Sequence, residues 1–156
     1  MEHSLINNEL RVIIPRDFSI MDEREMEKRF PRSRNHWGIQ NTVQDMIVYV
    51  SWTDENLLLR LFSDTPRVMD SAVSRARKQM SSYCREKVMK FQICGENAEG
   101  VSFVYSPRKS SERLRGEIAA VKLRQRYYVF AYSARNDDRF YCRQVFHGML
   151  TSMSAL

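Results

Sequence analysis

Short runs of apolar and β-branched residues in the first half of the chain predict strands. Leu10–Ile14 is such a run, and Pro15 directly after it predicts that the strand ends there. Residues 46–52 and Leu57–Phe62 predict two more strands. The polar residues 53–56 between them have the length of a turn, so we expect these two strands to form a β-hairpin.

The second half continues with four predicted strands, at residues 91–94, 101–106, 117–123 and 127–134. Residues 124–126 have the length of a tight hairpin turn between the last two. In the last strand Tyr128, Phe130 and Tyr132 fall on one face, and two further apolar residues fall on the other. Since neither face is polar, we expect this strand to be central in its sheet and covered on both sides.

Three segments have the apolar spacing of helices. Residues 22–30 begin with acidic and end with basic side chains before Pro31, as the helix dipole favours. Residues 139–153 repeat apolar side chains every three to four positions, behind a predicted cap at residues 136–138. A helix of about five turns begins at Pro66, and its apolar stripe contains Met69, Ala72, Val73, Ala76, Met80, Tyr83 and Cys84.

The order of predicted elements is strand, helix, two strands, helix, four strands, helix. Because strands follow one another directly, this order predicts an α+β fold with a single, mostly meander antiparallel sheet of about six to seven strands and two main helices packed on it. Residues 32–43 are polar, carry Trp37 and are expected to form a loop. The length fits one domain, 1–156. Strand 46–52 is a candidate uncovered edge for pairing two copies, so monomer and homodimer both stay open.

This order of elements resembles a family of small cytoplasmic proteins of unknown function from Gram-positive bacteria. The resemblance is carried by the opening sequence LRVIIPRDFSIMDEREMEKRFP and then by GVSFVYS, AAVKL, RYYVFAYSA and FYCRQVFHGMLTSM. The fold of that family is similar to that of PsbP, an extrinsic protein of photosystem II, and a nuclear release factor for the Ran GTPase shares it. The resemblance implies a PsbP-like fold and a binding or assembly domain rather than an enzyme, and it transfers no binding residue.

The sequence shows no pattern typical of export or membrane insertion. The N-terminus lacks a basic start followed by a long apolar run, and no apolar stretch approaches the about 20 residues of a membrane span. Cys84, Cys94 and Cys142 are odd in number and widely spaced, which argues against a disulfide framework and predicts buried thiols. We therefore expect a cytoplasmic protein without a membrane partner.

Residue types that carry catalysis or bind metals do not cluster along this sequence. His3, His36 and His147 have no second His or Cys at the spacing of a zinc site, and no glycine-rich phosphate loop occurs. Cys142 lies on the predicted last helix, but His147 lies about 140° around that helix from it, so we do not expect them to pair as nucleophile and base. We expect no catalytic residue, no metal and no cofactor.

Basic charge is the one uneven feature of the sequence. Lys and Arg number 25 against 19 Asp and Glu, which gives a formal net charge of +6. Charge reversal at Arg113 and Arg124 is expected to abolish any phosphate binding, although a solvated rim would also explain such charges. The candidate binding surface consists of six basic residues and one aromatic residue, namely Arg108, Lys109, Arg113, Arg115, Arg124, Arg126 and Trp37.

Three functions remain open on this evidence. The first is a non-enzymatic binding or adaptor domain that recognises another protein, for which we expect an apolar patch rimmed by Arg or a pocket at a sheet edge. The alternative is nucleic-acid or polyphosphate binding through the basic residues of 107–126, with strong salt dependence. The third is an enzyme with a deep pocket where His36, His147 or a Cys meets a carboxylate.

Overall fold

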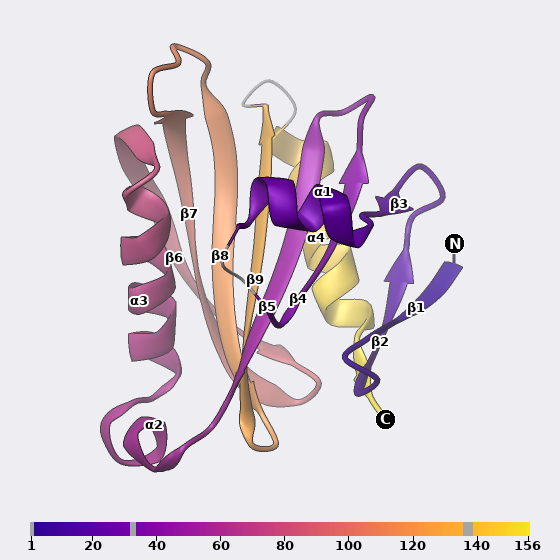
Figure 1. Ribbon diagram of the computed structural model, residues 1–156, viewed down its shortest axis with the longest axis vertical. Helices are drawn as coiled ribbons and strands as arrows, with labels where there is room; N and C mark the ends of the chain where they lie inside the picture. Colours follow the sequence, from indigo (N-terminus) through magenta and orange to yellow (C-terminus); the bar gives the residue numbers. More distant parts are fainter. Residues whose placement is uncertain (1, 32–33, 136–138) are drawn as a thin grey trace.

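A seven-stranded antiparallel sheet forms the centre of the molecule. The structure is a computed structural model that describes residues 2–31, 34–135 and 139–156 (Figure 1). Two meanders make up the sheet and meet where β5 pairs with β9, which confirms the predicted meander of six to seven strands. The strands follow the order β3 (Ser19–Ile20), β4 (His36–Asn41), β5 (Met46–Asp54), β9 (Arg126–Arg135), β8 (Leu114–Leu123), β7 (Glu96–Pro107) and β6 (Met80–Ile93).

A second sheet of three strands makes the prediction of a single sheet wrong. β2 (Leu10–Ile14) has the predicted bounds, but it pairs with β1 (Glu2–Ile6) on one side and with β10 (Ser154–Ala155) on the other. Because β2 has hydrogen-bonded neighbours on both sides, it does not add to the main sheet. Leu10 and Val12 of β2 instead point into the main core.

The helices are α1 (Glu23–Arg29), α2 (Leu57–Phe62), α3 (Thr65–Arg77) and α4 (Arg139–Ser152). α1 was predicted to within one residue at each end, and the Asp22 carboxylate caps it by accepting a hydrogen bond from the Glu25 amide at 2.9 Å. α4 matches its predicted bounds to one residue. The predicted cap of α4 at residues 136–138 lies outside the described residues.

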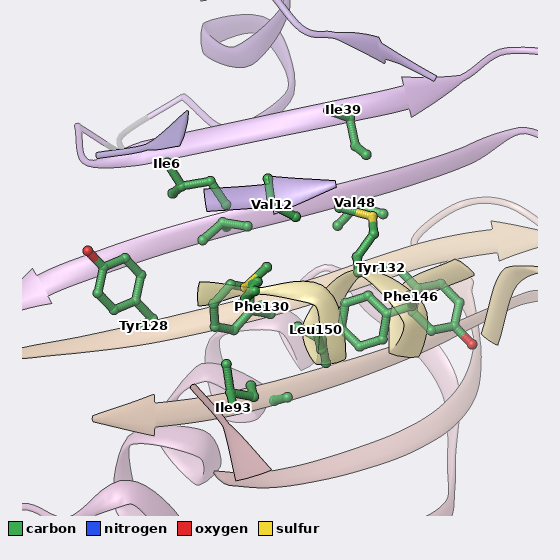
Figure 2. Close-up of a cluster of buried hydrophobic side chains, with 14 of the residues drawn as sticks. Ile6, Val12, Ile39, Val48, Ile93, Tyr128, Phe130, Tyr132, Phe146 and Leu150 are labelled. Carbon is green, nitrogen blue, oxygen red and sulfur yellow. The ribbon is translucent and has the colours of Figure 1, made fainter. Parts of the chain in front are cut away.

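Different elements cover the two faces of the main sheet. On one face α4 and the second sheet pack over the larger core, to which α4 contributes Phe146 and Leu150 (Figure 2). On the other face α3 packs through Met69 and Ala72. β9 is central and contributes to both cores, as predicted, with Tyr128, Phe130 and Tyr132 on the α4 side and Val129 and Ala131 on the α3 side.

The segment Leu57–Phe62 forms helix α2, so the predicted strand and hairpin are wrong. Its sequence, LLLRLF, is apolar at every position but one, and such a run does not distinguish a strand from a short helix. The Asn56 side chain accepts a hydrogen bond from the Leu59 amide at 2.9 Å and so caps the first turn. Leu has a high helix propensity, and capping stabilises the helix further.

The predicted five-turn helix is shorter than expected. α3 ends at Arg77, and β6 begins at Met80, where the helical stripe was predicted to continue to Cys84. Tyr83 continued the apolar pattern of the helix in the sequence, so the helix was predicted too long. In the structure Tyr83 lies on β6, and its ring packs against Phe103 with centroids 5.3 Å apart. Pairing along β7 extends β6 through the strand predicted at 91–94, so tertiary pairing outweighs the local pattern.

β4 occupies a segment that was predicted to be a loop. Its sequence, HWGIQN, looks polar and contains a glycine, yet each of its residues pairs with β5. Gly38 leaves room for its neighbours, because a Cβ there would lie 2.9 Å from the Met26 Sδ of α1 and 3.2 Å from the Val48 carbonyl oxygen of β5. Since β4 and β9 flank β5 on its two sides, the prediction that residues 46–52 form an uncovered edge is wrong.

Candidate functional site

Four large apolar side chains of helix α2 face solvent. Leu57, Leu58, Leu61 and Phe62 are 69%, 67%, 64% and 66% exposed, and no residue of α2 is buried. Single apolar side chains are common on protein surfaces, whereas a contiguous group of them marks an interaction site. We call these four residues the α2 surface.

The backbone of α2 is anchored at both ends. The Glu55 amide donates a hydrogen bond to the Gln125 carbonyl at 2.7 Å, and the Tyr127 hydroxyl donates to the Ser63 carbonyl at 3.4 Å. Both contacts lead to the turn between β8 and β9 and to the start of β9. Figure 1 shows α2 below α3, at the same end of the molecule as that turn. The apolar side chains are therefore presented on a helix held to the sheet.

Guanidinium groups flank the α2 surface. The Arg60 side chain is 75% exposed, and the Arg67 Nη1 donates a hydrogen bond to the Phe62 carbonyl at 2.8 Å. The neighbouring carboxylates are engaged within the chain: Glu55 pairs with Lys122, and Asp64 accepts a hydrogen bond from an α3 amide. This arrangement is the apolar patch rimmed by Arg that a protein-binding domain was expected to show.

The residues of the predicted basic surface do not come together. Arg108 and Lys109 lie in the loop between β7 and β8, whereas Arg124 lies in the turn at the other end of β8. A strand of ten residues spans about 30 Å, so the two groups are far apart. The basic residues of 107–126 therefore lie in two separate groups at opposite ends of β8.

Several of those residues already have partners within the chain. Arg113 donates hydrogen bonds to the Ser82 carbonyl at 3.0 Å, and Arg115 forms an ion pair with Glu86 at 2.7 Å. Arg124 bonds to the Leu156 carbonyl. The aromatic residue of the predicted surface, Trp37, is also covered, because it packs half-buried against the main core.

Arg126 has a structural role that joins the two sheets. Its guanidinium bonds to Glu9 and Asp54, and Glu9 also accepts a hydrogen bond from the Tyr128 hydroxyl. The Tyr128 hydrogen bond, together with Arg126, lowers the pKa of Glu9. Burial raises the pKa of Tyr128 to about 12. Glu9 is thus charged and Tyr128 neutral near neutral pH, which is the pairing that holds the β1–β2 turn to β9.

A buried carboxylate meets a histidine beneath α4. Glu117 is 1% exposed, and its Oε2 lies 2.9 Å from the His147 Nε2. The Arg143 Nε lies 3.6 Å from the other carboxylate oxygen. Burial, together with the Glu117 charge, raises the pKa of Tyr132 on the neighbouring strand. His147 therefore does meet a carboxylate, which is one of the conditions of the enzyme hypothesis. Glu117 was not predicted as its partner, because the two residues are 30 positions apart.

Two cavities open elsewhere on the described surface. The first measures about 100 Å³ and is lined by Glu9, Cys94, Glu96 and Arg124, with three other residues. The second measures about 380 Å³ and lies beside His3 and the first two strands. Neither is lined by Glu117 or His147. Burial raises the pKa of the Cys94 thiol, which keeps it protonated and weakly nucleophilic.

The three cysteines differ in exposure. Cys142 is buried as predicted, and Cys94 is half-buried. Cys84 is exposed, so its predicted burial is wrong, because it lies on the edge strand β6 rather than on a helix stripe. Within residues 2–31, 34–135 and 139–156, no three His, Cys, Asp or Glu side chains are grouped to hold a metal ion. No helix in that part of the chain is long and apolar enough to span a membrane.

Comparison with known proteins shows similarity in structure only. No protein-family model and no curated sequence matches the chain. PsbP from the cyanobacterium Synechocystis superposes with a TM-score of 0.64 at 11% identity, over 98% of this chain and 90% of that one. Mog1p from Saccharomyces cerevisiae, a Ran-binding protein, gives 0.65 at 9% identity, over 98% and 95%. The chain has the fold of PsbP and Mog1p.

A third neighbour comes from a different biological context. LpqN from Mycobacterium tuberculosis, which is involved in cell envelope biogenesis, gives a TM-score of 0.65 at 12% identity, over 94% of this chain and 82% of that one. The predicted PsbP-like fold is confirmed. At these identities the similarity shows the fold alone, since unrelated functions recur on one fold.

Proposed function

We propose that this chain is a non-enzymatic, cytoplasmic binding domain that recognises another protein through the α2 surface. The observation that carries the proposal is the exposure of Leu57, Leu58, Leu61 and Phe62 on one anchored helix. Burying one such side chain in an interface contributes about 1.5–3 kcal/mol. Four of them supply the apolar centre that stable protein interfaces need.

The partner that fits is a protein with an apolar groove bordered by carboxylates. A helix of six residues is about 9 Å long, which suits a groove that receives a few closely spaced anchors. Arg60 stands at the rim with a 75% exposed side chain and a long ion pair to Glu55 at 3.8 Å, which it can exchange for an acidic residue of the partner. This charge arrangement favours an acidic rim on the partner.

The fold supports the class of function without naming the partner. Mog1p, one structural neighbour, is described as a Ran-binding protein. The α2 surface itself is argued from the side chains of this chain, because binding residues do not transfer by position at 9% identity.

The test compares the Leu58→Ser/Phe62→Ser variant with the wild type. The tagged protein is used to capture partners from nuclease-treated lysate at low and high salt, and the captured partner is then purified. Titration calorimetry with that partner is expected to show a Kd at least about 100-fold higher for the variant, since each buried anchor contributes about 2 kcal/mol or more.

The matched control is Ile20→Ser/Val43→Ser, which removes two exposed apolar side chains away from α2, 50% and 87% exposed. It is expected to bind the partner like the wild type. An unchanged Kd in the α2 variant, or equal losses in both variants, would contradict the proposal. Self-association that depends on Phe62, measured by light scattering, would assign the surface to a second copy instead.

A further inference from the structure

The positive charge of the chain is concentrated in two segments. Residues 75–87 and 107–113 together carry eight Lys and Arg and two Glu. Their formal excess equals the net charge of +6 of the whole chain, so the rest of the sequence is formally neutral. Charge gathered in one region in this way creates a stronger local surface potential than the same charge spread over the whole surface.

The fold brings these two segments together at one end of the molecule. The first contains the end of α3 and the start of β6, and the second is the loop between β7 and β8. The Arg108 amide donates a hydrogen bond to the Gln79 carbonyl at 3.1 Å, and Arg113 reaches the Ser82 carbonyl at 3.0 Å. Figure 1 shows the β7–β8 loop at the top, beside the upper end of α3.

We call this region the cationic end, and its exposed basic residues are Arg75, Arg77, Lys78, Arg85, Lys87, Arg108, Lys109 and Arg113. Glu86, one of its two acids, is paired with Arg115 on β8. The cationic end differs from the surface predicted from sequence because α3 and β6 take the place of Arg124 and Arg126. Those two lie at the far end of β8 and have partners there.

We propose that the cationic end binds the phosphodiester backbone of a nucleic acid. Most of its exposed basic residues are Arg, whose planar guanidinium contacts two phosphate oxygens at once. Of the large apolar side chains that the described chain exposes, none falls within residues 75–87 or 107–113. A protein interface needs such apolar anchors, whereas contacts to phosphates need none.

The spacing of the charges suits a polymer. The basic side chains come from a helix end, a strand start and a loop, so they are spread over three elements rather than focused on one point. Arg77 lies 4.4 Å from the centroid of the Tyr83 ring, a cation–π contact that restrains its side chain on the surface. Several phosphates along one strand can therefore be contacted together.

The test uses a fluorescein-labelled single-stranded RNA of about 20 nucleotides, longer than the typical site of one small domain. Fluorescence anisotropy measures its Kd between about 50 and 200 mM salt. Four or five phosphate contacts predict that log K falls against log salt with a slope of about −3. The Arg75→Glu/Arg85→Glu/Arg108→Glu variant is expected to bind at least about 50-fold more weakly, with its circular dichroism spectrum unchanged.

The matched control, Arg11→Glu/Arg16→Glu/Arg24→Glu, makes the same change in net charge at exposed positions elsewhere. It is expected to retain binding to within about threefold, because distant charges are largely screened. Equal losses in both variants would overturn the proposal, as would wild-type protein that binds anionic lipid vesicles but not RNA. The Leu58→Ser/Phe62→Ser variant is expected to bind RNA normally, so this proposal and the proposed function fail separately.

Discussion

At the scale of single residues, Glu117 is a buried carboxylate that depends on its partners in α4. It is 1% exposed, and its carboxylate oxygens lie 2.9 Å from the His147 Nε2 and 3.6 Å from the Arg143 Nε. Burying a carboxylate costs several kcal/mol, and the attraction of a partner offsets this cost only while the partner remains. The contact between Glu117 and His147 therefore helps to fix the position of α4 over β8, although its net contribution to the free energy of unfolding is small.

We expect His147→Ala to lower the free energy of unfolding by about 3 kcal/mol, because it leaves Glu117 buried with a single, longer contact. The Glu117→Leu/His147→Leu variant should lose less, because apolar side chains of similar volume remove both the charge and its desolvation cost. Urea unfolding of the wild type, Glu117→Leu, His147→Leu and Glu117→Leu/His147→Leu measures the coupling, with His147→Ala measured beside them. A double variant less stable than His147→Ala would contradict this account.

The sequence identified His147 as a candidate but had no means of pairing it with Glu117. The two residues are 30 positions apart, and they meet only because α4 packs across β8. The exposure of Trp37 could not be predicted from the sequence either. Trp37 was placed on the candidate binding surface, in a segment predicted to be a loop, yet it is half-buried on β4. Contacts and exposure of this kind arise from tertiary packing, which periodicity does not encode.

At the scale of elements, the helices and strands with strong local sequence signals were predicted from the sequence. The acidic first turn and basic last turn of α1, the hairpin of β8 and β9 and the apolar ladder of α4 were all predicted. β4 and β6 were missed because long-range pairing defines them. α2 was missed for another reason, since a run of six residues that is apolar at all positions but one shows no helical or strand period. That run forms the candidate site.

Two glycines should respond in opposite ways to the same substitution. At Gly116 on β8 a Cβ would lie 2.7 Å from the Tyr132 carbonyl oxygen, so Gly116→Ala forces the strands apart and should lower the free energy of unfolding by about 1–3 kcal/mol. Gly148 lies in α4 with nothing within 4 Å of that position, so Gly148→Ala should raise it by about 0.5–1 kcal/mol.

Chemical denaturation of the two Ala variants beside the wild type measures both changes. Gly148→Ala is also the control for Gly116→Ala, because it adds the same methyl group where there is space. Equal effects of the two substitutions would show that the close approach at Gly116 is relieved without cost.

At the scale of the whole molecule, two surfaces lie at opposite ends of α3. The α2 surface is next to the start of this helix, and the cationic end includes its last turn. A helix of 13 residues is about 20 Å long, so the two surfaces share no residue and are separated by a rigid element. Arg108 and Lys109 belong both to the surface predicted from the sequence and to the cationic end. The position of the cationic end opposite the α2 surface depends on the fold.

This separation predicts that the two binding events are independent. The Kd of the purified protein partner should change by less than about twofold when the RNA is saturating, because coupling requires a shared residue or an element with two arrangements. Titration calorimetry with and without RNA measures the ratio. A tenfold change in either direction would show that the ends communicate or that the two ligands overlap.

Because the excess charge lies at one end, the protein carries a permanent electric dipole in addition to its net charge. In the field of a polyanion this dipole experiences a torque that turns the cationic end toward the polyanion before any contact forms. Figure 1 shows α2 at the other end, so the same rotation turns the apolar helix outward. The electrostatic field thus selects the orientation of the protein at encounter. The distance over which it acts is set by the Debye length, about 8 Å at physiological ionic strength.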